Sequence, residues 1–197
     1  MKQVATALDG PAGQVRRVFD HHRLWRLSGD AFAAAANLIA AHEAPARPQM
    51  IVGIARGGTP LARHLAGRLG VDAVEVSARH NTTDTTYLQA TGRVEVTQPA
   101  VARPRPGARL LVVDDICGTG ATLAAVTTML TGWCAPAGLR TAVLCRNAAA
   151  DDTTSLPDVW VWRLRDWVVF PWETFPDREE PTEDLAVPGR ISTKETR

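Results

Sequence analysis

The sequence predicts an α/β fold in which an open, mainly parallel sheet is flanked by helices. Three apolar runs, at residues 50–55, 110–113 and 141–145, are continuous enough to form strands that are buried on both faces. The first two runs are each followed by a glycine-containing turn and then by apolar residues at helical spacing. Strands that alternate with helices in this way indicate parallel pairing through helical crossovers.

Composition places the chain among ordinary globular proteins. Its 197 residues suffice for one α/β domain, with 45% hydrophobic and 22% charged residues. The net charge of +1 gives no argument for a nucleic acid or an anionic membrane as partner. Cys117, Cys134 and Cys145 lack the spacing of a zinc site or a disulfide framework, and neither a signal peptide nor a membrane span is recognisable. We therefore expect a cytoplasmic protein with reduced cysteines.

The chain before the first long strand is predicted to be helical. Residues 14–27 carry apolar side chains among Arg and His and predict a short amphipathic helix. Ser28 is a good N-cap for a second, alanine-rich helix at residues 29–43. Further along, residues 71–77 predict another strand, and the polar, proline-rich end of the chain predicts a flexible tail.

The stretch that follows Val113 carries the strongest chemical signal. Asp114 and Asp115 end the predicted strand, and a turn containing two glycines and two threonines leads into a helix. Such a turn leaves backbone N–H groups at a helix start, which form an anion site. An acid pair beside a phosphate cradle suits a sugar phosphate with a divalent cation nearby. A P-loop would need a Lys that is absent, and a dinucleotide fingerprint would need a third Gly where Leu123 stands.

A second turn of the same kind follows the strand at residues 50–55. Arg56, Gly57 and Gly58 precede Pro60, which is well placed in the first turn of a helix. This geometry suits a second anion.

These motifs resemble those of the type I phosphoribosyltransferases, which use phosphoribosyl pyrophosphate (PRPP). The resemblance implies that Asp114 and Asp115 bind the ribose hydroxyls and Mg²⁺, directly or through water. It also implies that Arg56, Gly57 and Gly58 bind pyrophosphate, and that Asp114, Asp115 and Arg56 are catalytic. The implied 5-phosphate loop consists of Gly118, Thr119, Gly120, Ala121 and Thr122.

The segment at residues 167–173 resembles the base-binding hood of the xanthine-guanine and related 6-oxopurine members. By this resemblance Trp167 stacks on the base, the main chain of Val168 meets the ring edge, and Glu173 accepts from an exocyclic amine. The family's lysine that donates to the 6-oxo group is matched by Arg146.

Residues 78–107 match the family's mobile lid. Arg79 is its implied PRPP-binding residue, and His80 and Tyr87 are its other chemically interesting side chains. A lid that excludes water would protect an oxocarbenium-like ribosyl centre from hydrolysis.

Two positions depart from the 6-oxopurine pattern. Gly118 stands where the family usually has an Asp that handles a purine proton, and Arg146 is not an interchangeable replacement for Lys. We therefore carry two hypotheses. The first is an Mg²⁺-dependent enzyme, either of purine salvage or of a specialised pathway for a non-canonical heterocycle. The second is a non-catalytic protein that senses PRPP or a nucleotide.

The predicted organisation has four parts. These are an N-terminal helical segment at 1–48, a PRPP-binding core at 49–150 that includes the lid, a hood at 151–175 and a flexible tail at 176–197. The predicted partners are PRPP, a nucleobase and a second copy of the chain in a homodimer.

Overall fold

The computed structural model describes residues 20, 22–79, 95–97, 104–147, 156–176 and 180–194. The elements in chain order are β1 (Leu24–Arg26), α1 (Gly29–Glu43), the 3₁₀ helix η1 (Ala44–Ala46), β2 (Met50–Ala55), α2 (Gly58–Leu69), β3 (Asp72–Arg79), β4 (Glu95–Thr97), β5 (Arg109–Cys117), α3 (Ala121–Cys134), β6 (Gly138–Asn147), β7 (Val159–Leu164), β8 (Trp167–Val169), β9 (Thr182–Asp184) and β10 (Ser192–Thr193).

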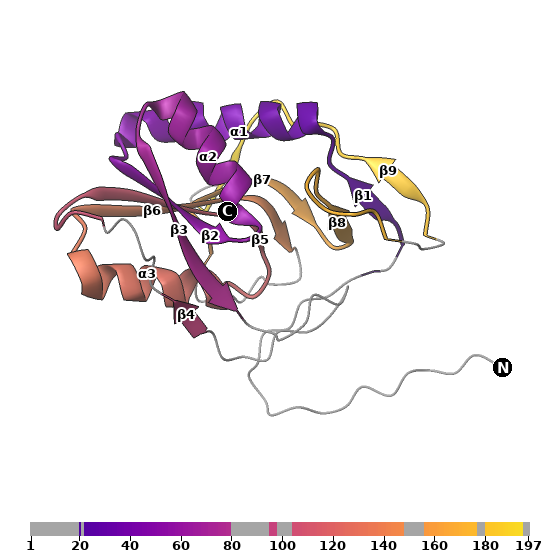
Figure 1. The fold of residues 1–197 in the computed structure, drawn as a ribbon. Coiled ribbons are helices and arrows are strands. Elements are labelled where there is room, and N and C mark those ends of the chain that lie inside the picture. Colours follow the sequence, from indigo (N-terminus) through magenta and orange to yellow (C-terminus); the bar gives the residue numbers. More distant parts are fainter. Residues whose placement is uncertain are drawn as a thin grey trace.

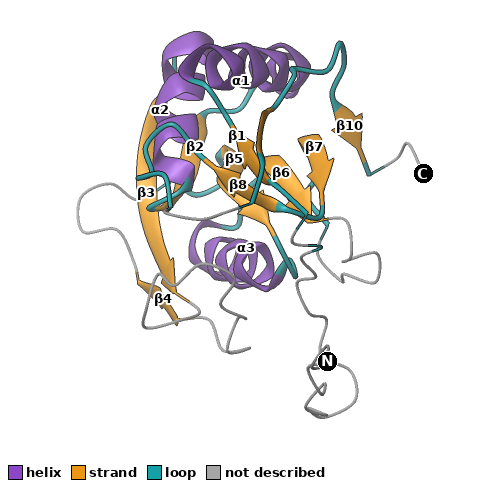
Figure 2. Cartoon of the chain, turned by 90° about the vertical axis from the view of Figure 1, so that its right-hand side faces the viewer, coloured by secondary structure: helices purple, strands orange, loops and turns teal. Residues whose placement is uncertain are grey.

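The main sheet confirms the predicted fold class. Its strand order is β10-β7-β6-β5-β2-β3-β4, in which the strands from β7 to β3 are parallel. The edge strands β4 and β10 are antiparallel to their neighbours. Helices α1 and α2 cover one face of this sheet and α3 covers the other (Figures 1 and 2).

The two faces of the sheet have separate hydrophobic cores, and this explains the continuous apolar runs. Leu111 and Val113 of β5 belong to the cluster under α1 and α2. Leu110 and Val112 belong to the cluster under α3. Because successive strand residues point to opposite faces, a strand between two helical layers needs apolar residues at every position.

The order of the central strands creates a topological switch point. From β2 the chain continues to β3 on one side, and β5 then pairs with the other side of β2. Connections therefore diverge between the carboxyl ends of β2 and β5, where open α/β sheets bind their ligands.

Local signals placed two early elements correctly. Helix α1 begins after Ser28, whose Oγ accepts a hydrogen bond of 3.1 Å from the N–H of Ala31. Strand β2 spans the six residues predicted for it.

A second, three-stranded parallel sheet, β8-β1-β9, lies beyond the carboxyl ends of the main strands (Figure 1). The predicted helix at 14–27 is wrong for Leu24–Arg26, which form the middle strand of this sheet. Pairing with β8 and β9 satisfies the backbone on both edges of β1, and Leu24 is fully buried, so tertiary contacts override the local pattern. The rest of the predicted helix, apart from residues 20, 22, 23 and 27, lies outside the described residues.

The predicted flexible tail does not hold for residues 180–194. Within it β9 pairs with β1, and β10 pairs with β7. Leu185 is buried, and the carbonyl of Ala186 accepts a hydrogen bond of 2.9 Å from Nε1 of Trp162. Residues 180–194 therefore pack against both sheets and cover part of the core.

Most of the predicted lid lies outside the described residues, including His80 and Tyr87. Its described parts include β4, which pairs with the end of β3 at Arg79. Only the backbone of Arg79 is described.

Candidate active site

The turn after β2 is packed tightly against the end of β5. Arg56 and Gly57 form the turn, with the Arg56 side chain exposed and the Arg56 carbonyl accepting from the N–H of Thr59 at 3.3 Å. A Cβ on Gly58 would lie 2.5 Å from the carbonyl oxygen of Val113, and a Cβ on Gly57 would overlap the carboxylate of Asp115. Both glycines are needed for this close approach, so the turn and the acid pair form one site.

The acid pair lies where β5 separates from β2. Pairing between β2 and β5 ends at Gly53 and Val113, whereas β5 continues to pair with β6 as far as Cys117. Asp114 and Asp115 are therefore half-buried at the opening between the two strands. The N–H of Asp115 donates to Oδ1 of Asp114 at 3.0 Å, and the N–H of Ile116 donates to Oδ1 of Asp115 at 2.7 Å. These bonds orient both carboxylates.

The turn from Gly118 to Thr122 leads into the N-terminus of α3. Gly120 precedes the helix with φ of +80°, a conformation that favours glycine. Oγ1 of Thr119 accepts from the N–H of Ala121 at 3.4 Å. Among the described glycines φ is positive at Gly70, Gly107 and Gly120, so Gly118 does not require glycine for a left-handed backbone. The turn and the helix start have the geometry of an anion site.

The predicted hood residues belong to β8 and the turn after it. Trp167 is half-buried, and Val168 is buried and paired with Trp25 of β1. In the following turn the N–H of Glu173 donates to the carbonyl of Phe170, and the N–H of Phe170 donates to Oε2 of Glu173, both at 3.0 Å. The Glu173 carboxylate is thus folded back onto its own turn.

The hood approaches the acid pair closely enough for their charges to interact. Burial raises the pKa of Glu173, the hydrogen bond from Phe170 opposes this effect, and the charge of Asp115 adds to the increase. The residue is exposed as a whole, so the buried part is its carboxyl group under the turn. Predicted base-binding and ribose-binding residues therefore share one electrostatic environment.

Arg146 is buried near the carboxyl end of β6, beside Cys117 of β5. Its Cζ lies 5.0 Å from the ring centroid of Trp160, which is within the range of a cation–π interaction. Trp160 is itself buried, so its role is to pack the core and to hold the guanidinium.

The three cysteines are buried thiols. All three lie in the described part of the chain, are buried and form no disulfide. Burial raises the pKa of Cys134, and burial together with Asp115 raises the pKa of Cys145, so both stay protonated thiols.

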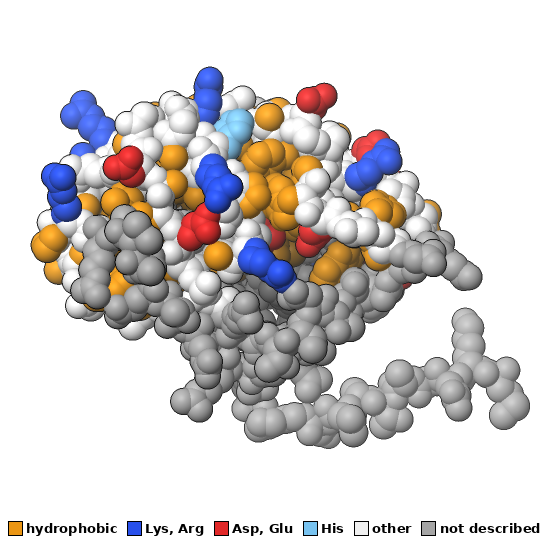
Figure 3. Space-filling view, viewed as in Figure 1, with side chains coloured by type: hydrophobic (Ala, Val, Ile, Leu, Met, Phe, Trp, Pro, Cys, Tyr) orange, Lys and Arg blue, Asp and Glu red, His pale blue; other side chains and the backbone are white. Residues whose placement is uncertain are grey.

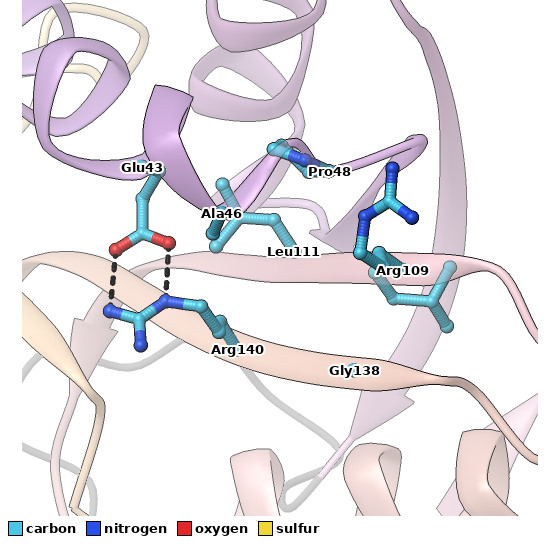
Figure 4. A pocket seen from close by; sticks show the side chains of 8 residues that line it. Glu43, Ala46, Pro48, Arg109, Leu111, Gly138 and Arg140 are labelled. Atoms are coloured by element: carbon cyan, nitrogen blue, oxygen red, sulfur yellow. Dashed lines mark hydrogen bonds and ion pairs between the residues drawn. The ribbon is translucent and has the colours of Figure 1, made fainter.

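A small hollow lies at the amino ends of the main strands, between η1 and the beginnings of β5 and β6 (Figure 4). Glu43, which is almost fully buried, accepts two hydrogen bonds from Arg140, of 2.6 and 2.9 Å, and lies 3.0 Å from Nδ1 of His42. Nε of Arg109 donates to the carbonyl of Arg47 at 2.7 Å. The charged groups here serve to attach the end of α1 to the sheet.

Sequence reasoning missed the aromatic side chains that support the hood. Figure 3 shows hydrophobic side chains gathered between α2 and the small sheet. The ring contacts in this region join Phe32 of α1, His64 of α2, and Phe170 and Trp172 of the hood turn. No local sequence signal connects these positions.

The described residues contain no group of three His, Cys, Asp or Glu side chains that could hold a metal ion. Within the same ranges, no helix is long and apolar enough to cross a membrane.

Comparison with known proteins agrees with this architecture. Residues 25–178 match the phosphoribosyl transferase domain. A purine phosphoribosyltransferase from Pyrococcus horikoshii OT3 is 25% identical, with a TM-score of 0.66 over 79% of this chain and 98% of that one. A xanthine-guanine-hypoxanthine phosphoribosyltransferase from Helicobacter pylori is 20% identical, with a TM-score of 0.62 over 77% and 93% of the two chains. A Neisseria gonorrhoeae protein solved with bound ppGpp is 17% identical, with a TM-score of 0.58 over 78% and 90%. A search of the curated proteins found no match.

The fold and the family match define a phosphoribosyltransferase of type I architecture, as the sequence predicted. The chain belongs to the phosphoribosyl transferase family, and its fold is similar to that of purine phosphoribosyltransferases.

Proposed function

We propose that the chain transfers the 5-phosphoribosyl group of PRPP to a ring nitrogen of a purine-like base and releases pyrophosphate. In this reaction the bond from ribose C1 to the pyrophosphate oxygen breaks, a bond from C1 to nitrogen forms, and the base loses its nitrogen-bound proton. The observation that carries the proposal is the contact of Gly57 and Gly58 with the acid-bearing end of β5. That contact joins the predicted leaving-group site to the predicted ribose site.

The residues have distinct roles in this proposal. Asp114 and Asp115 bind the ribose hydroxyls, and the turn at residues 118–122 binds the 5-phosphate through backbone N–H groups. The exposed Arg56 neutralises charge on the departing pyrophosphate. Positioning and electrostatics supply most of the catalysis in such a site.

Mg²⁺ fits the acid pair as a cofactor. Two half-buried carboxylates at the strand opening supply the oxygen ligands that this ion prefers, directly or through water. They are too few to form a complete cage, so the remaining ligands would come from water and from oxygens of PRPP. When bound, the ion would offset negative charge on the pyrophosphate.

The base is proposed to bind between the hood and the carboxyl end of β6. Trp167 stacks on it, the Val168 backbone meets its edge, and Glu173 accepts from an exocyclic group. Arg146 recognises an oxo or carboxylate substituent, which its planar group of donors suits.

A nucleotide-sensing protein of the same fold is the second candidate. Gly118 favours it, because this position offers no side chain to move a proton on the base. The ppGpp-bound relative from Neisseria gonorrhoeae shares the fold and supports testing nucleotide binding. One argument opposes this second candidate: a protein that only senses a nucleotide needs neither a base-binding hood nor a turn that binds departing pyrophosphate.

Pyrophosphate release from PRPP and Mg²⁺, measured against a panel of bases, distinguishes the two candidates. The enzyme proposal expects release with at least one purine-like heterocycle. The double variant Asp114→Asn with Asp115→Asn should lose PRPP binding in calorimetry, because neutral amides cannot hold the hydroxyl and metal cluster as carboxylates do. Unchanged PRPP affinity in this variant would exclude the assignment of the acid pair.

A further inference from the structure

Trp172 is held between two aromatic rings that come from different parts of the fold. Its ring stacks on Phe170, with centroids 5.1 Å apart and planes at 13°. The ring of Phe32 approaches it edge-on, with centroids 5.3 Å apart and planes at 83°. Both are favoured geometries for aromatic pairs. Trp172 therefore connects the hood turn to α1.

The hood turn is closed by two hydrogen bonds on either side of Trp172. Two hydrogen bonds of 3.0 Å join Phe170 and Glu173 and enclose Pro171 and Trp172: the N–H of Phe170 donates to the Glu173 carboxylate, and the backbone N–H of Glu173 donates to the carbonyl of Phe170. This turn directly follows β8, which carries Trp167 and Val168. Fixing the indole of Trp172 consequently fixes the carboxylate of Glu173 as well.

Phe32 also contacts α2, the helix that follows the turn of Arg56 and Gly57, which is proposed to bind pyrophosphate. Its ring lies 5.7 Å from that of His64 on α2, edge-on at 75°. Nε2 of His64 lies 3.0 Å from Oδ1 of Asn37 on α1, so it donates when it carries the hydrogen. Burial, with a contribution from Arg68, lowers the pKa of His64 and keeps the ring neutral at pH 7. Phe32 is thus the meeting point of α1, α2 and the hood.

The support behind Phe32 includes contacts outside the hood, in addition to the bond from the N–H of Leu27 to the carbonyl of Val169 in β8. Helix α1 is capped by Ser28 at its beginning, and Arg140 of β6 binds Glu43 at its end. The rings of Phe32 and Trp172 are only half-buried and pack against the outside of the core cluster. A half-buried contact between a fixed helix and a turn acts mainly on the position of the turn.

Resting on the proposed function, we propose that Phe32 is a positioning residue for the base, acting through Trp172 on the hood turn that carries Glu173. Phe32 does not touch the base. It sets how often the turn holds Glu173 in the geometry that receives the base. Since α2 keeps its separate contact with α1 through His64 and Asn37, we expect no corresponding effect on PRPP.

The first test compares Phe32→Ala with Phe32→Tyr, which keeps the ring, and with Phe175→Ala as a matched control. Phe175 lies just past the same turn, is 44% exposed and makes no ring contact within the described residues. Phe32→Ala should raise KM for the base about three- to tenfold, the scale of one aromatic pair, with KM for PRPP unchanged. The other two variants should match the wild type. A parallel rise in both KM values, or no rise in KM for the base, overturns the proposal.

The second test needs no catalysis. Phe32→Ala should speed hydrogen exchange at the amides of Phe170 and Glu173, while exchange at Asp115 and Ile116 stays unchanged. If Phe32→Ala does not fold, Phe32→Leu takes its place in both tests. Unchanged exchange in the hood turn rejects the positioning role even if the wild type is active. Faster exchange in Phe32→Ala, together with a wild type that releases no pyrophosphate with any base, places the failure in the proposed function.

Discussion

Alanine at Gly57 should weaken PRPP binding, whereas alanine at the adjacent Gly58 should lower stability. The added Cβ at Gly57 meets the side-chain carboxylate of Asp115. The added Cβ at Gly58 lies 2.5 Å from the carbonyl oxygen of Val113 and 2.9 Å from Cα of Asp114. The Asp115 carboxylate can rotate away from a methyl group at Gly57. The backbone of β5 is paired with β6 and cannot move away from a methyl group at Gly58. The two variants should therefore fail in different ways.

The expected magnitudes follow from this difference. Gly58→Ala forces β5 and α2 apart, and overpacking of this kind costs about 1–3 kcal/mol. For a chain of this size each kcal/mol lowers Tm by roughly 2–4 °C. Gly57→Ala should change Tm little. It should, however, displace Asp115 from the ribose site, and losing hydrogen bonds to a charged group costs about 1.5–3 kcal/mol. This corresponds to a PRPP Kd about 10- to 150-fold higher.

Gly67→Ala is the matched control, because Gly67 lies inside α2 and an added Cβ there meets nothing within 4 Å. Replacing a helix glycine with alanine should raise stability by about 0.5–1 kcal/mol and leave PRPP affinity unchanged. Titration calorimetry with PRPP and Mg²⁺, together with thermal unfolding, measures both quantities. Wild-type PRPP affinity in Gly57→Ala would refute the claim that this contact joins the two halves of the site.

Three further predictions concern the base site and the chain end. Trp167→Ala should weaken base binding by about 1–3 kcal/mol with little change in PRPP affinity, measured by calorimetry, because one stacking surface is lost. If the variant unfolds instead, this tryptophan belongs to the core. Gly118→Asp should raise kcat/KM on 6-oxopurines, since general acid–base help is worth roughly 10²–10⁴-fold, and equal or lower values would show that the reaction needs no acid there. Burial alone would raise the pKa of Asp158, but hydrogen bonds from Lys194 and Thr141 outweigh it and lower the pKa. This carboxylate therefore stabilises the fold above its unfolded pKa of about 3.9 and loses that effect as pH falls through its lower folded value. Asp158→Asn should flatten the acid limb of stability below about pH 4 in denaturant unfolding, and an unaltered limb would contradict the assignment.

The elements that sequence reasoning placed correctly are those whose signals are local. The run from Leu110 to Val113 is apolar at every position because it lies between two helical layers, and this information is contained in four consecutive residues. Gly57 and Gly58 after β2 lie where the backbone approaches β5, and Gly120 after β5 has a positive φ. Chemistry that depends on such turns can be predicted before the fold is known.

The small sheet could not be predicted, because its pairing depends on distant residues. Strand β1 is three residues long, too short for a periodic signal, and its partners lie about 140 and 160 residues away. The ion pairs of this strand are equally long-range: Arg23, just before β1, pairs with Glu183, and Arg26 of β1 pairs with Asp184. The same distance hid the packing of the tail, where a polar composition suggested flexibility.

Because of this arrangement, substitutions in the protein should affect the binding of the two proposed substrates differently. The proposed PRPP loops lie on the main sheet, whereas Trp167 lies on a strand whose neighbour in the small sheet is β1, which in turn pairs with β9. The hood thus depends on segments from both ends of the described chain, and the proposed phosphate and pyrophosphate sites depend on neither. Substitutions in β1 or β9 should therefore alter recognition of the base while PRPP binding persists. The division between a locally encoded PRPP site and a hood assembled over long range would allow the base specificity of this fold to change independently of its reaction.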